Sequence, residues 1–203
     1  ILTMNVFVFN NIHYLQKIGT AMGSKVAPTF ANLFMGFIEK IILRNSPQFI
    51  DKIYKNVWLR YIDDIFILWS GTEAELEQFR KHINSIHPSI KFTIGCDFLT
   101  RSVPFLDVDV TVKSGKFVTD LYRKSTHVCQ YLLPSSCHPP HVCKNIPFSL
   151  GYRLLRICSD KLTFELRLKE LEEMLIHRGY SKKVIKNAFV KFWILNVLKH
   201  LKR

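Results

Sequence analysis

Asp63 and Asp64 are the residues best suited to chemistry, because they are adjacent carboxylates in a segment, residues 57–69, that is otherwise mostly apolar and aromatic. Burying an ionised carboxylate without a partner costs several kcal/mol, and a bound cation would offset that cost. Mg²⁺ prefers one or two carboxylates together with substrate phosphates, so the pair indicates metal-dependent phosphoryl transfer. The same pattern is also typical of a hairpin tip that carries an exposed Asp-Asp pair.

A glycine-bearing loop, residues 16–24, comes before an apolar run at helical spacing that follows Pro28. Glycines let backbone N–H groups approach an anionic ligand or a template strand, and a helix N-terminus favours phosphate. Glycine before a helix is also typical of a simple turn. The loop strengthens the case for a phosphoryl-transfer site only in combination with Asp63 and Asp64.

The elements that must position these residues follow from hydrophobic periodicity and turn signals. A hairpin is expected around Asn10-Asn11, a helix after Pro28, and a strand or strand-turn-strand over 57–69. Thr72 and Glu75 predict a capped helix that runs to about residue 86. Further strands are predicted over 90–94, 103–112 and 116–122. Short apolar pieces interrupted by prolines, the last of them Pro147, precede helices predicted over 150–158, over 161–177, which Gly179 ends, and from 181 to the end. The fold class is therefore α/β (α+β), with an antiparallel sheet, packed helices and a helical end.

The composition excludes several classes of protein. With 203 residues, 48% of them hydrophobic, the chain can bury a core, unlike a disordered basic tail or a collagen-like chain. Lys and Arg outnumber Asp and Glu by 29 to 16, which favours a polyanionic partner, most often nucleic acid. No stretch of about 20 uninterrupted apolar residues predicts a membrane span. Five cysteines, an odd number, fit a reducing compartment.

Several strings resemble the reverse transcriptases of Penelope-like retroelements, whose nearest relative is telomerase. Residues 16–28 and 31–35 look like motif B of that family, and Tyr61-Ile62-Asp63-Asp64 looks like motif C. Residues 105–108, 122–126 and 136–139 are similar to later strings of the same enzymes. The resemblance implies a partial palm over residues 1–124, followed by a helical thumb over 125–203 with a helix-turn-helix-like end.

The resemblance also implies a reaction, RNA-templated addition of deoxynucleotides to a primer 3′ end. Asp63 and Asp64 would hold the catalytic Mg²⁺, with two ions in the complete enzyme. Template and nucleotide would contact Gln16, Gly19, Gly23, Ser24 and Tyr61. Phe105, Leu106 and Asp107 would form the primer grip. The partners would be an RNA template, a DNA primer and a dNTP, and the location the nucleus.

One departure from the family pattern concerns the third metal ligand. The motif A aspartate lies upstream of motif B in the family and would fall before Ile1. Because the chain starts without Met and enters mid-pattern, we expect it to be part of a longer protein and catalytically incomplete by itself. Two rival hypotheses stay open: a non-catalytic nucleic-acid-binding remnant, and a helix-turn-helix DNA-binding protein that uses its C-terminal helices alone.

Basic residues supply the remaining candidates. Lys91 follows Asp64 in the segment where related polymerases place a lysine near the leaving pyrophosphate, although it is equally typical of a solvated lysine. Contacts to the nucleic-acid backbone are expected from Arg123, Lys124, Lys182, Lys183 and Lys186. The last helix would also carry Lys191, Lys199, Lys202 and Arg203, with Phe189, Phe192, Trp193 and Leu195 facing inward.

A group of soft ligands lies between residues 129 and 143, namely Cys129, Cys137, His138, His141 and Cys143. These residue types suit zinc in principle. Their spacing contains no Cys-x₂-Cys pair, and His138 belongs to the family string at 136–139. We therefore expect loop residues here and no zinc.

Overall fold

The computed structural model describes the backbone of residues 5–21 and 23–201, and side chains within these ranges up to residue 192. The chain divides into two compact units, residues 1–94 and residues 95–203. Within the described ranges, no helix has the length and hydrophobicity needed to cross a membrane.

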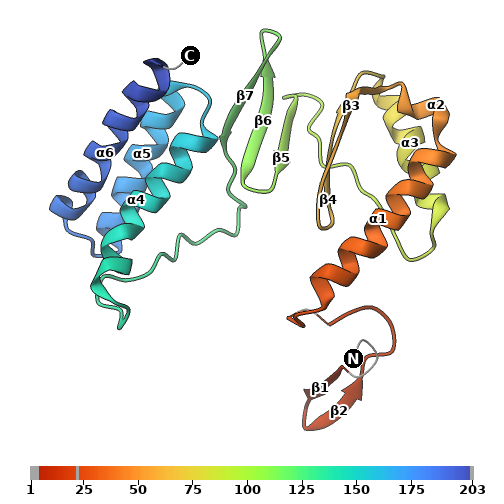
Figure 1. Cartoon of the computed structure of the whole chain (residues 1–203), viewed down its shortest axis with the longest axis horizontal. Coiled ribbons are helices and arrows are strands. Elements are labelled where there is room, and N and C mark those ends of the chain that lie inside the picture. The colour runs from red at the N-terminus through yellow and green to blue at the C-terminus, as the bar shows by residue number, and fades with distance from the viewer. Residues whose placement is uncertain (1–4, 22, 202–203) are drawn as a thin grey trace. The chain divides into compact units, whose positions relative to one another are not determined.

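The first unit contains two strand hairpins and three helices (Figure 1). In chain order these are β1 (Val6–Phe9), β2 (Ile12–Leu15), α1 (Ala27–Asn45), α2 (Pro47–Ile50), β3 (Ile53–Tyr61), β4 (Asp64–Trp69) and α3 (Glu73–Ile86). β1 and β2 pair antiparallel around Asn10 and Asn11, both with positive φ. Asn tolerates this backbone region, so the predicted hairpin is confirmed.

The core of the first unit lies between α1 and α3. Ile38 and Ile42 of α1 are buried with Phe79 and Ile83 of α3. The β3–β4 hairpin packs against this cluster through Trp58 and Trp69, among other side chains. α1 is therefore fixed to this core through the face that carries Ile38 and Ile42.

The predicted helix after Thr72 is confirmed in detail. The Thr72 hydroxyl accepts the Glu75 N–H at 3.2 Å, and the Glu75 carboxylate accepts the Thr72 N–H at 2.7 Å. This capping box satisfies two backbone groups that the first turn of a helix leaves unpaired. Through the hydrogen bond from the Thr72 N–H, it also lowers the pKa of the Glu75 carboxyl.

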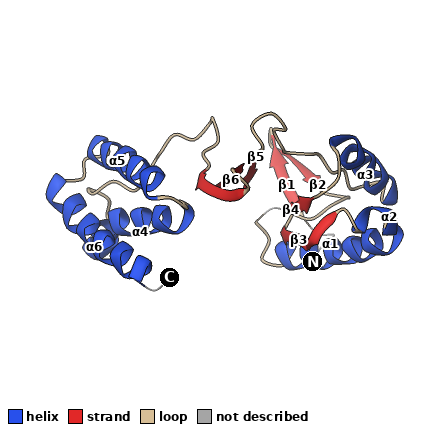
Figure 2. Cartoon of the chain, turned by 90° about the horizontal axis from the view of Figure 1, so that it is seen from above, coloured by secondary structure: helices blue, strands red, loops and turns tan. Residues whose placement is uncertain are grey.

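The second unit contains an antiparallel sheet in the order β5-β6-β7, together with three helices. Its elements are β5 (Ser102–Phe105), β6 (Val108–Lys113), β7 (Lys116–Leu121), α4 (Pro140–Ile157), α5 (Lys161–His177) and α6 (Lys182–Leu201). The three helices form one packed group, seen together in Figure 2. Mixed α/β architecture with small antiparallel sheets and a helical C-terminal part is therefore established.

The core of the second unit draws on all three helices. Leu154 of α4, Leu171 and Leu175 of α5, and Ile185 and Phe192 of α6 are almost completely buried. Phe192 lies directly over Gly151 of α4, where a side chain on residue 151 would overlap its ring. Glycine at this position lets α4 and α6 approach closely.

Two strand predictions need correction. Residues 90–94 form no strand, because the side chain of Asn84 takes both backbone groups of Phe92: it accepts the Phe92 N–H at 2.6 Å and donates to the Phe92 carbonyl at 3.0 Å. The strand predicted over 103–112 is two strands, since Leu106 has a positive φ and turns the chain back on itself.

The helix predicted over 150–158 is longer, and α4 begins at Pro140. Proline suits the first position of a helix, where its missing N–H costs no hydrogen bond. Pro147, treated as a breaker in the sequence, lies inside α4 and is buried. Burial of this apolar ring in the core offsets the lost intrahelical hydrogen bond.

The compact units divide at residue 94, whereas the sequence changes character near residue 124. Strand β7 is bound to the helices, because the Thr119 hydroxyl donates to the Ile157 carbonyl at 2.5 Å and Arg167 pairs with Asp120 at 2.7 Å. The sheet β5–β7 thus belongs with α4–α6 by contact. The division into palm and thumb at 124 stays a prediction.

Candidate carboxylate hairpin and nucleic-acid interface

Asp63 and Asp64 lie at the tip of the β3–β4 hairpin. Tyr61 pairs with Asp64, so Ile62 and Asp63 form the turn. All four side chains are exposed, which corrects the expectation of a carboxylate pair buried inside a strand. The exposed hairpin tip was the alternative interpretation of the same pattern. Ile62 has φ +57°, an unfavourable backbone region for a β-branched residue.

The two carboxylates are free to take a ligand. Neither Asp63 nor Asp64 forms a side-chain hydrogen bond or ion pair within the part of the chain that the structure describes. Carboxylate oxygens are the donors that Mg²⁺ prefers, and a pair of them with waters and phosphates fits its coordination. Within those same residues no group of three or more His, Cys, Asp or Glu side chains could hold a metal ion.

The loop of residues 16–24 is held by its own polar groups. The Gln16 amide accepts from Asn5 at 2.7 Å and donates to the Ile18 carbonyl at 2.9 Å. Gly19 and Gly23 have φ values of +84° and +89°, a region that glycine adopts without strain. The Ser24 hydroxyl accepts the Val26 N–H at 3.4 Å, just before α1 begins. The loop therefore leads directly into the helix N-terminus, as the sequence indicates.

The helix that follows this loop is joined to the carboxylate hairpin. Arg60 of β3 donates through Nη1 both to the Asn32 side chain of α1 at 2.8 Å and to the Ile62 carbonyl at 2.9 Å. The structure thus brings the motif B-like helix and the motif C-like turn together. Nothing in the sequence pattern indicated Arg60 as the link.

Lys91 lies in the segment after α3 and reaches back to the last turn of that helix. Its ammonium group donates to the carbonyl of Asn84 at 3.1 Å, and the side chain is otherwise exposed. A cation near a helix C-terminus satisfies a carbonyl that the helix leaves free. This contact gives Lys91 a structural role, and its predicted role beside a leaving group stays a prediction.

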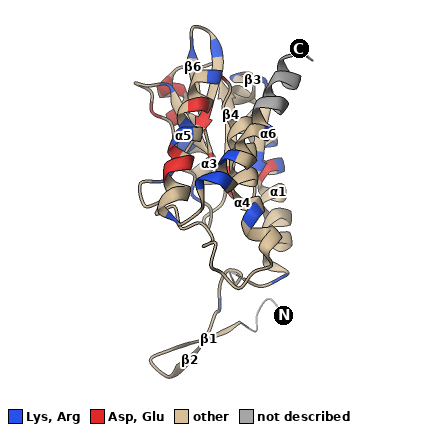
Figure 3. Cartoon of the chain, turned by 90° about the vertical axis from the view of Figure 1, so that its left-hand side faces the viewer, with Lys and Arg blue, Asp and Glu red and all other residues tan. Residues whose placement is uncertain are grey.

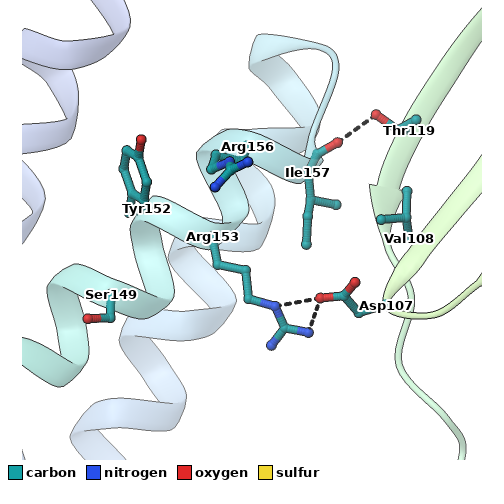
Figure 4. Close-up of a pocket in the computed structure, with 8 residues that line it drawn as sticks. All are labelled: Asp107, Val108, Thr119, Ser149, Tyr152, Arg153, Arg156 and Ile157. Carbon is teal, nitrogen blue, oxygen red and sulfur yellow. Dashed lines mark hydrogen bonds and ion pairs between the residues drawn. The ribbon is translucent and has the colours of Figure 1, made fainter. Parts of the chain in front are cut away.

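Phe105 is the last residue of β5, and Leu106 and Asp107 form the turn to β6. Arg153 of α4 binds the Asp107 carboxylate (Figure 4). The Arg153 Nε donates to the Asp107 carboxylate at 2.6 Å. This pair lies in an open cavity of about 440 Å³ between α4 and the sheet. The cavity is also lined by Arg156, which has no hydrogen bond or ion pair in the described part of the chain. Nothing in the sequence pattern indicates Arg153 or Arg156, because both look like ordinary helix residues.

Arg123 forms an ion pair with Glu170 of α5, in which its guanidinium donates to the carboxylate at 3.1 Å. Lys124 is exposed. Arg167 binds both Asp120 of β7 and Glu170. Burial raises the pKa of the Asp120 carboxyl, but hydrogen bonds from Arg167 and from the Leu121 N–H outweigh it, so this pKa is lowered. The ion pairs Arg167–Asp120 and Arg123–Glu170 connect β7 and the segment after it to α5.

A Schellman motif joins α5 to α6. The Tyr180 N–H donates to the Leu175 carbonyl at 3.0 Å and the Gly179 N–H to the Ile176 carbonyl at 2.9 Å. Gly179 has φ +89°, the left-handed conformation that this motif requires. Tyr180 and Leu175 are both buried, which adds the apolar contact that accompanies such a turn. The predicted Gly179 helix end is confirmed.

The segment before α4 is attached to this turn. Arg178 donates through Nη2 to the Tyr131 carbonyl at 2.6 Å, and the Tyr180 hydroxyl donates to the Leu132 carbonyl at 2.8 Å. Residues 131–132, α4, α5 and the first part of α6 are therefore one packed unit with a short glycine-containing turn between its last two helices.

Residues 130–190 match the family model of the animal helix-turn-helix domain. The match covers the three-helix packing and the Gly179 turn and less than half of the chain, so it describes this region alone. Searches of curated proteins and of solved structures find no match to the chain.

The helix-turn-helix region separates its charges by helix. Helices α4 and α6 contain no Asp or Glu, whereas α5 contains four Glu residues. In Figure 3 α5 carries red acidic segments, and red also appears on other parts of the chain. The exposed cations of α4 and of the described part of α6 are Lys144, Arg153, Arg156, Lys182, Lys183, Lys186 and Lys191. Lys199, Lys202 and Arg203 lie outside the described side chains, as do Trp193 and Leu195.

The buried face of α6 matches the prediction where it is described. Phe189 and Phe192 are buried with Ile185 and Ala188, at the spacing of one helical face. Lys182, Lys183 and Lys186 therefore face solvent. None of these three ammonium groups has a partner in the described part of the chain.

The cysteines of this region serve packing. Cys143 is buried and its thiol lies 3.8 Å from the Leu133 carbonyl, while His138 contacts the Ser136 hydroxyl at 2.7 Å. Cys158 is buried beside Asp120, and burial together with that carboxylate raises the pKa of its thiol to about 11.

Proposed function

We propose that the helix-turn-helix region binds duplex DNA, with the N-terminal half of α6 as the main contact. The observation that carries the proposal is the solvent face of α6, where Lys182, Lys183 and Lys186 stand together with no carboxylate on the same helix. Lysines that neutralise phosphates release counterions, and this release supplies most of the affinity of non-specific binding.

Arg156 of α4 is a further exposed cation without a partner in the described part of the chain, and it lines the cavity between α4 and the sheet. α4 and α6 pack directly against each other, and neither contains Asp or Glu. A duplex that approaches these helices therefore meets no acidic side chain of either one. Glu172 and Glu173 of α5, which have no ion-pair partner in the described part of the chain, disfavour approach from that helix. The lysines of α6 would contact phosphates, which position a protein on DNA without reading its sequence. A nuclear location belongs to this proposal, because DNA is the partner.

The test is fluorescence anisotropy with labelled 20-base-pair duplexes of unrelated sequence, titrated at several salt concentrations. Lys183→Ala with Lys186→Ala should lower affinity equally for all duplexes and reduce the slope of log K against log salt by about 0.9 for each lost phosphate contact. Lys169→Ala is the matched control, because Lys169 is an exposed lysine on the acidic helix α5.

Two results would overturn the proposal. The first is a wild-type protein that binds no duplex at low salt. The second is a double variant that binds with the same affinity and the same salt slope as Lys169→Ala.

A second function is favoured by one specific observation, the Asp63-Asp64 pair at a hairpin tip held against the motif B-like helix. We infer from it, together with the resemblance to Penelope-like reverse transcriptases, that residues 1–124 are a partial reverse-transcriptase palm. Asp63 and Asp64 would hold Mg²⁺, which when bound stabilises the negative charge of the transferring phosphoryl group. The loop of residues 16–24 would bind template and nucleotide, and an RNA–DNA hybrid would be the substrate.

Primer extension on an RNA template tests this second function. A version of the chain extended upstream through an aspartate-bearing strand should extend the primer, and Asp63→Ala with Asp64→Ala should abolish extension. The chain of residues 1–203 should be inactive, because its described residues bring no third carboxylate to Asp63 and Asp64. Inactivity of the extended version, or activity that survives loss of both aspartates, would contradict the palm assignment.

A further inference from the structure

The turn that presents Asp63 and Asp64 is strained and lies at the exposed end of a hairpin. Ile62 is β-branched, has φ +57° and has a side chain that is 37% exposed. A residue in this backbone region persists only where surrounding contacts over-determine its conformation. The hydrogen bonds of the turn therefore decide how the two carboxylates are presented.

Arg60 makes those hydrogen bonds. Its Nη1 donates to the Ile62 carbonyl at 2.9 Å and to the Asn32 side chain at 2.8 Å. Its Nε donates to the Glu39 carboxylate at 2.8 Å, so both ends of the guanidinium are fixed to α1. The Arg60 side chain is only 15% exposed although it reaches the tip of an open hairpin.

Glu39 connects this arrangement to the core. The same carboxylate oxygen that accepts from Arg60 accepts from the Trp58 indole at 2.9 Å, and Trp58 packs against the Phe79 cluster. The Glu39 side chain is 18% exposed. Because Glu39 pairs the charge of Arg60, the guanidinium does not act as a bare cation beside the two aspartates.

We infer that Arg60 is a positioning residue for Asp63 and Asp64, which fixes the Ile62 carbonyl and so presents both carboxylates to one metal ion. This inference rests on the second proposed function, in which the pair holds Mg²⁺. A planar guanidinium can bridge Asn32, Glu39 and the Ile62 carbonyl at once, and a lysine ammonium cannot reproduce that geometry.

The experiment titrates the full chain with Mn²⁺ and follows free Mn²⁺ by electron paramagnetic resonance. Arg60→Lys keeps the charge and loses the bridge, so it should weaken Mn²⁺ binding by about ten-fold, the low end for loss of a group that orients a metal ligand. Asn32→Ala should weaken it less. Arg44→Lys is the matched control, because Arg44 is an exposed arginine of α1 away from the bridge. Asp63→Asn with Asp64→Asn should abolish the site.

Amide hydrogen exchange supplies a readout that does not need the metal. In Arg60→Lys the amides of residues 61–64 should exchange faster than in wild type, while those of Phe79 and Ile83 on α3 keep their protection. If wild type binds no Mn²⁺ through the aspartates, the metal function fails, and exchange at 61–64 still decides the role of Arg60. Unchanged exchange and unchanged Mn²⁺ affinity in Arg60→Lys would overturn the inference. If Arg60→Lys loses protection on α3 as well, Asn32→Ala decides, and unchanged exchange at 61–64 in that variant would overturn it.

Discussion

The hydroxyl of Tyr180, in the turn between α5 and α6, donates to the carbonyl of Leu132 at 2.8 Å. This bond joins residues that are 48 positions apart and attaches the segment before α4 to the glycine turn. It explains in physical terms why a helix-turn-helix unit extends upstream of its first helix, as the match from residue 130 indicates.

Removal of this hydroxyl should therefore destabilise the helical unit. Tyr180→Phe leaves the Leu132 carbonyl without its donor and should lower the free energy of unfolding by about 1 kcal/mol. Urea denaturation followed by circular dichroism measures the change. Tyr152→Phe is the control, because Tyr152 is partly exposed and its hydroxyl has no partner in the described part of the chain. Equal effects of the two variants would contradict the role assigned to Tyr180.

Gly151 sets how closely α4 and α6 can approach. Gly151→Ala should destabilise the protein by about 1–3 kcal/mol, because the added methyl group overlaps the Phe192 ring. Gly95→Ala, where an added Cβ meets nothing within 4 Å, should change stability little. Phe192→Leu should partly rescue Gly151→Ala in thermal unfolding. A double variant no more stable than Gly151→Ala would locate the strain elsewhere.

Cys158 should make stability depend on pH in the alkaline range. Its folded pKa of about 11 lies above the ordinary thiol value of about 8.5, so the unfolded chain releases this proton first as the pH rises. The folded state is thus favoured below about pH 8.5, and this contribution is lost as the pH approaches 11. Urea denaturation across this range should show a larger loss in wild type than in Cys158→Ala, because Tyr131 and Tyr180, whose pKa values are also raised by burial, contribute equally to both proteins. Cys137→Ala, which removes an exposed thiol, should behave as wild type.

Arg156 should contribute one phosphate contact to DNA binding. Arg156→Ala removes an unpaired guanidinium from the cavity beside α4, so affinity should fall equally for unrelated duplexes and the salt slope should decrease by about 0.9. Anisotropy titrations measure both quantities. Arg123→Gln is an informative comparison, because Arg123 is paired with Glu170 and should matter much less. The reverse order of effects would move the interface from α4 toward the sheet.

Local sequence signals predicted the elements whose caps and turns lie within a few residues. Thr72 with Glu75 predicted the start of α3, Asn10-Asn11 the first hairpin, and Gly179 the end of α5. These signals act through backbone hydrogen bonds between near neighbours. The residues that form such a cap or turn are therefore already adjacent in the sequence, and no tertiary contact is needed to predict it.

Predictions failed where a distant side chain overrode the local pattern. Residues 90–94 alternate like a strand, yet Asn84 takes the backbone groups of Phe92. Pro147 looks like a helix breaker until the burial of its ring is known. In the candidate sites, Asp63 and Asp64 were identified by their types, whereas Arg60, Arg153 and Arg156 gain meaning only from tertiary contacts that no spacing rule contains.

The separation of charge between helices has a kinetic consequence. Glu172 and Glu173 of α5 have no ion-pair partner in the described part of the chain, and most exposed cations of the helical unit lie on α4 and α6, so the unit carries an electric dipole as well as a net charge. In the field of a polyanion such a dipole turns the molecule during diffusion, so that α6 arrives first. More encounters are then productive, and the association rate exceeds what the same charges would give if they were spread evenly over the surface.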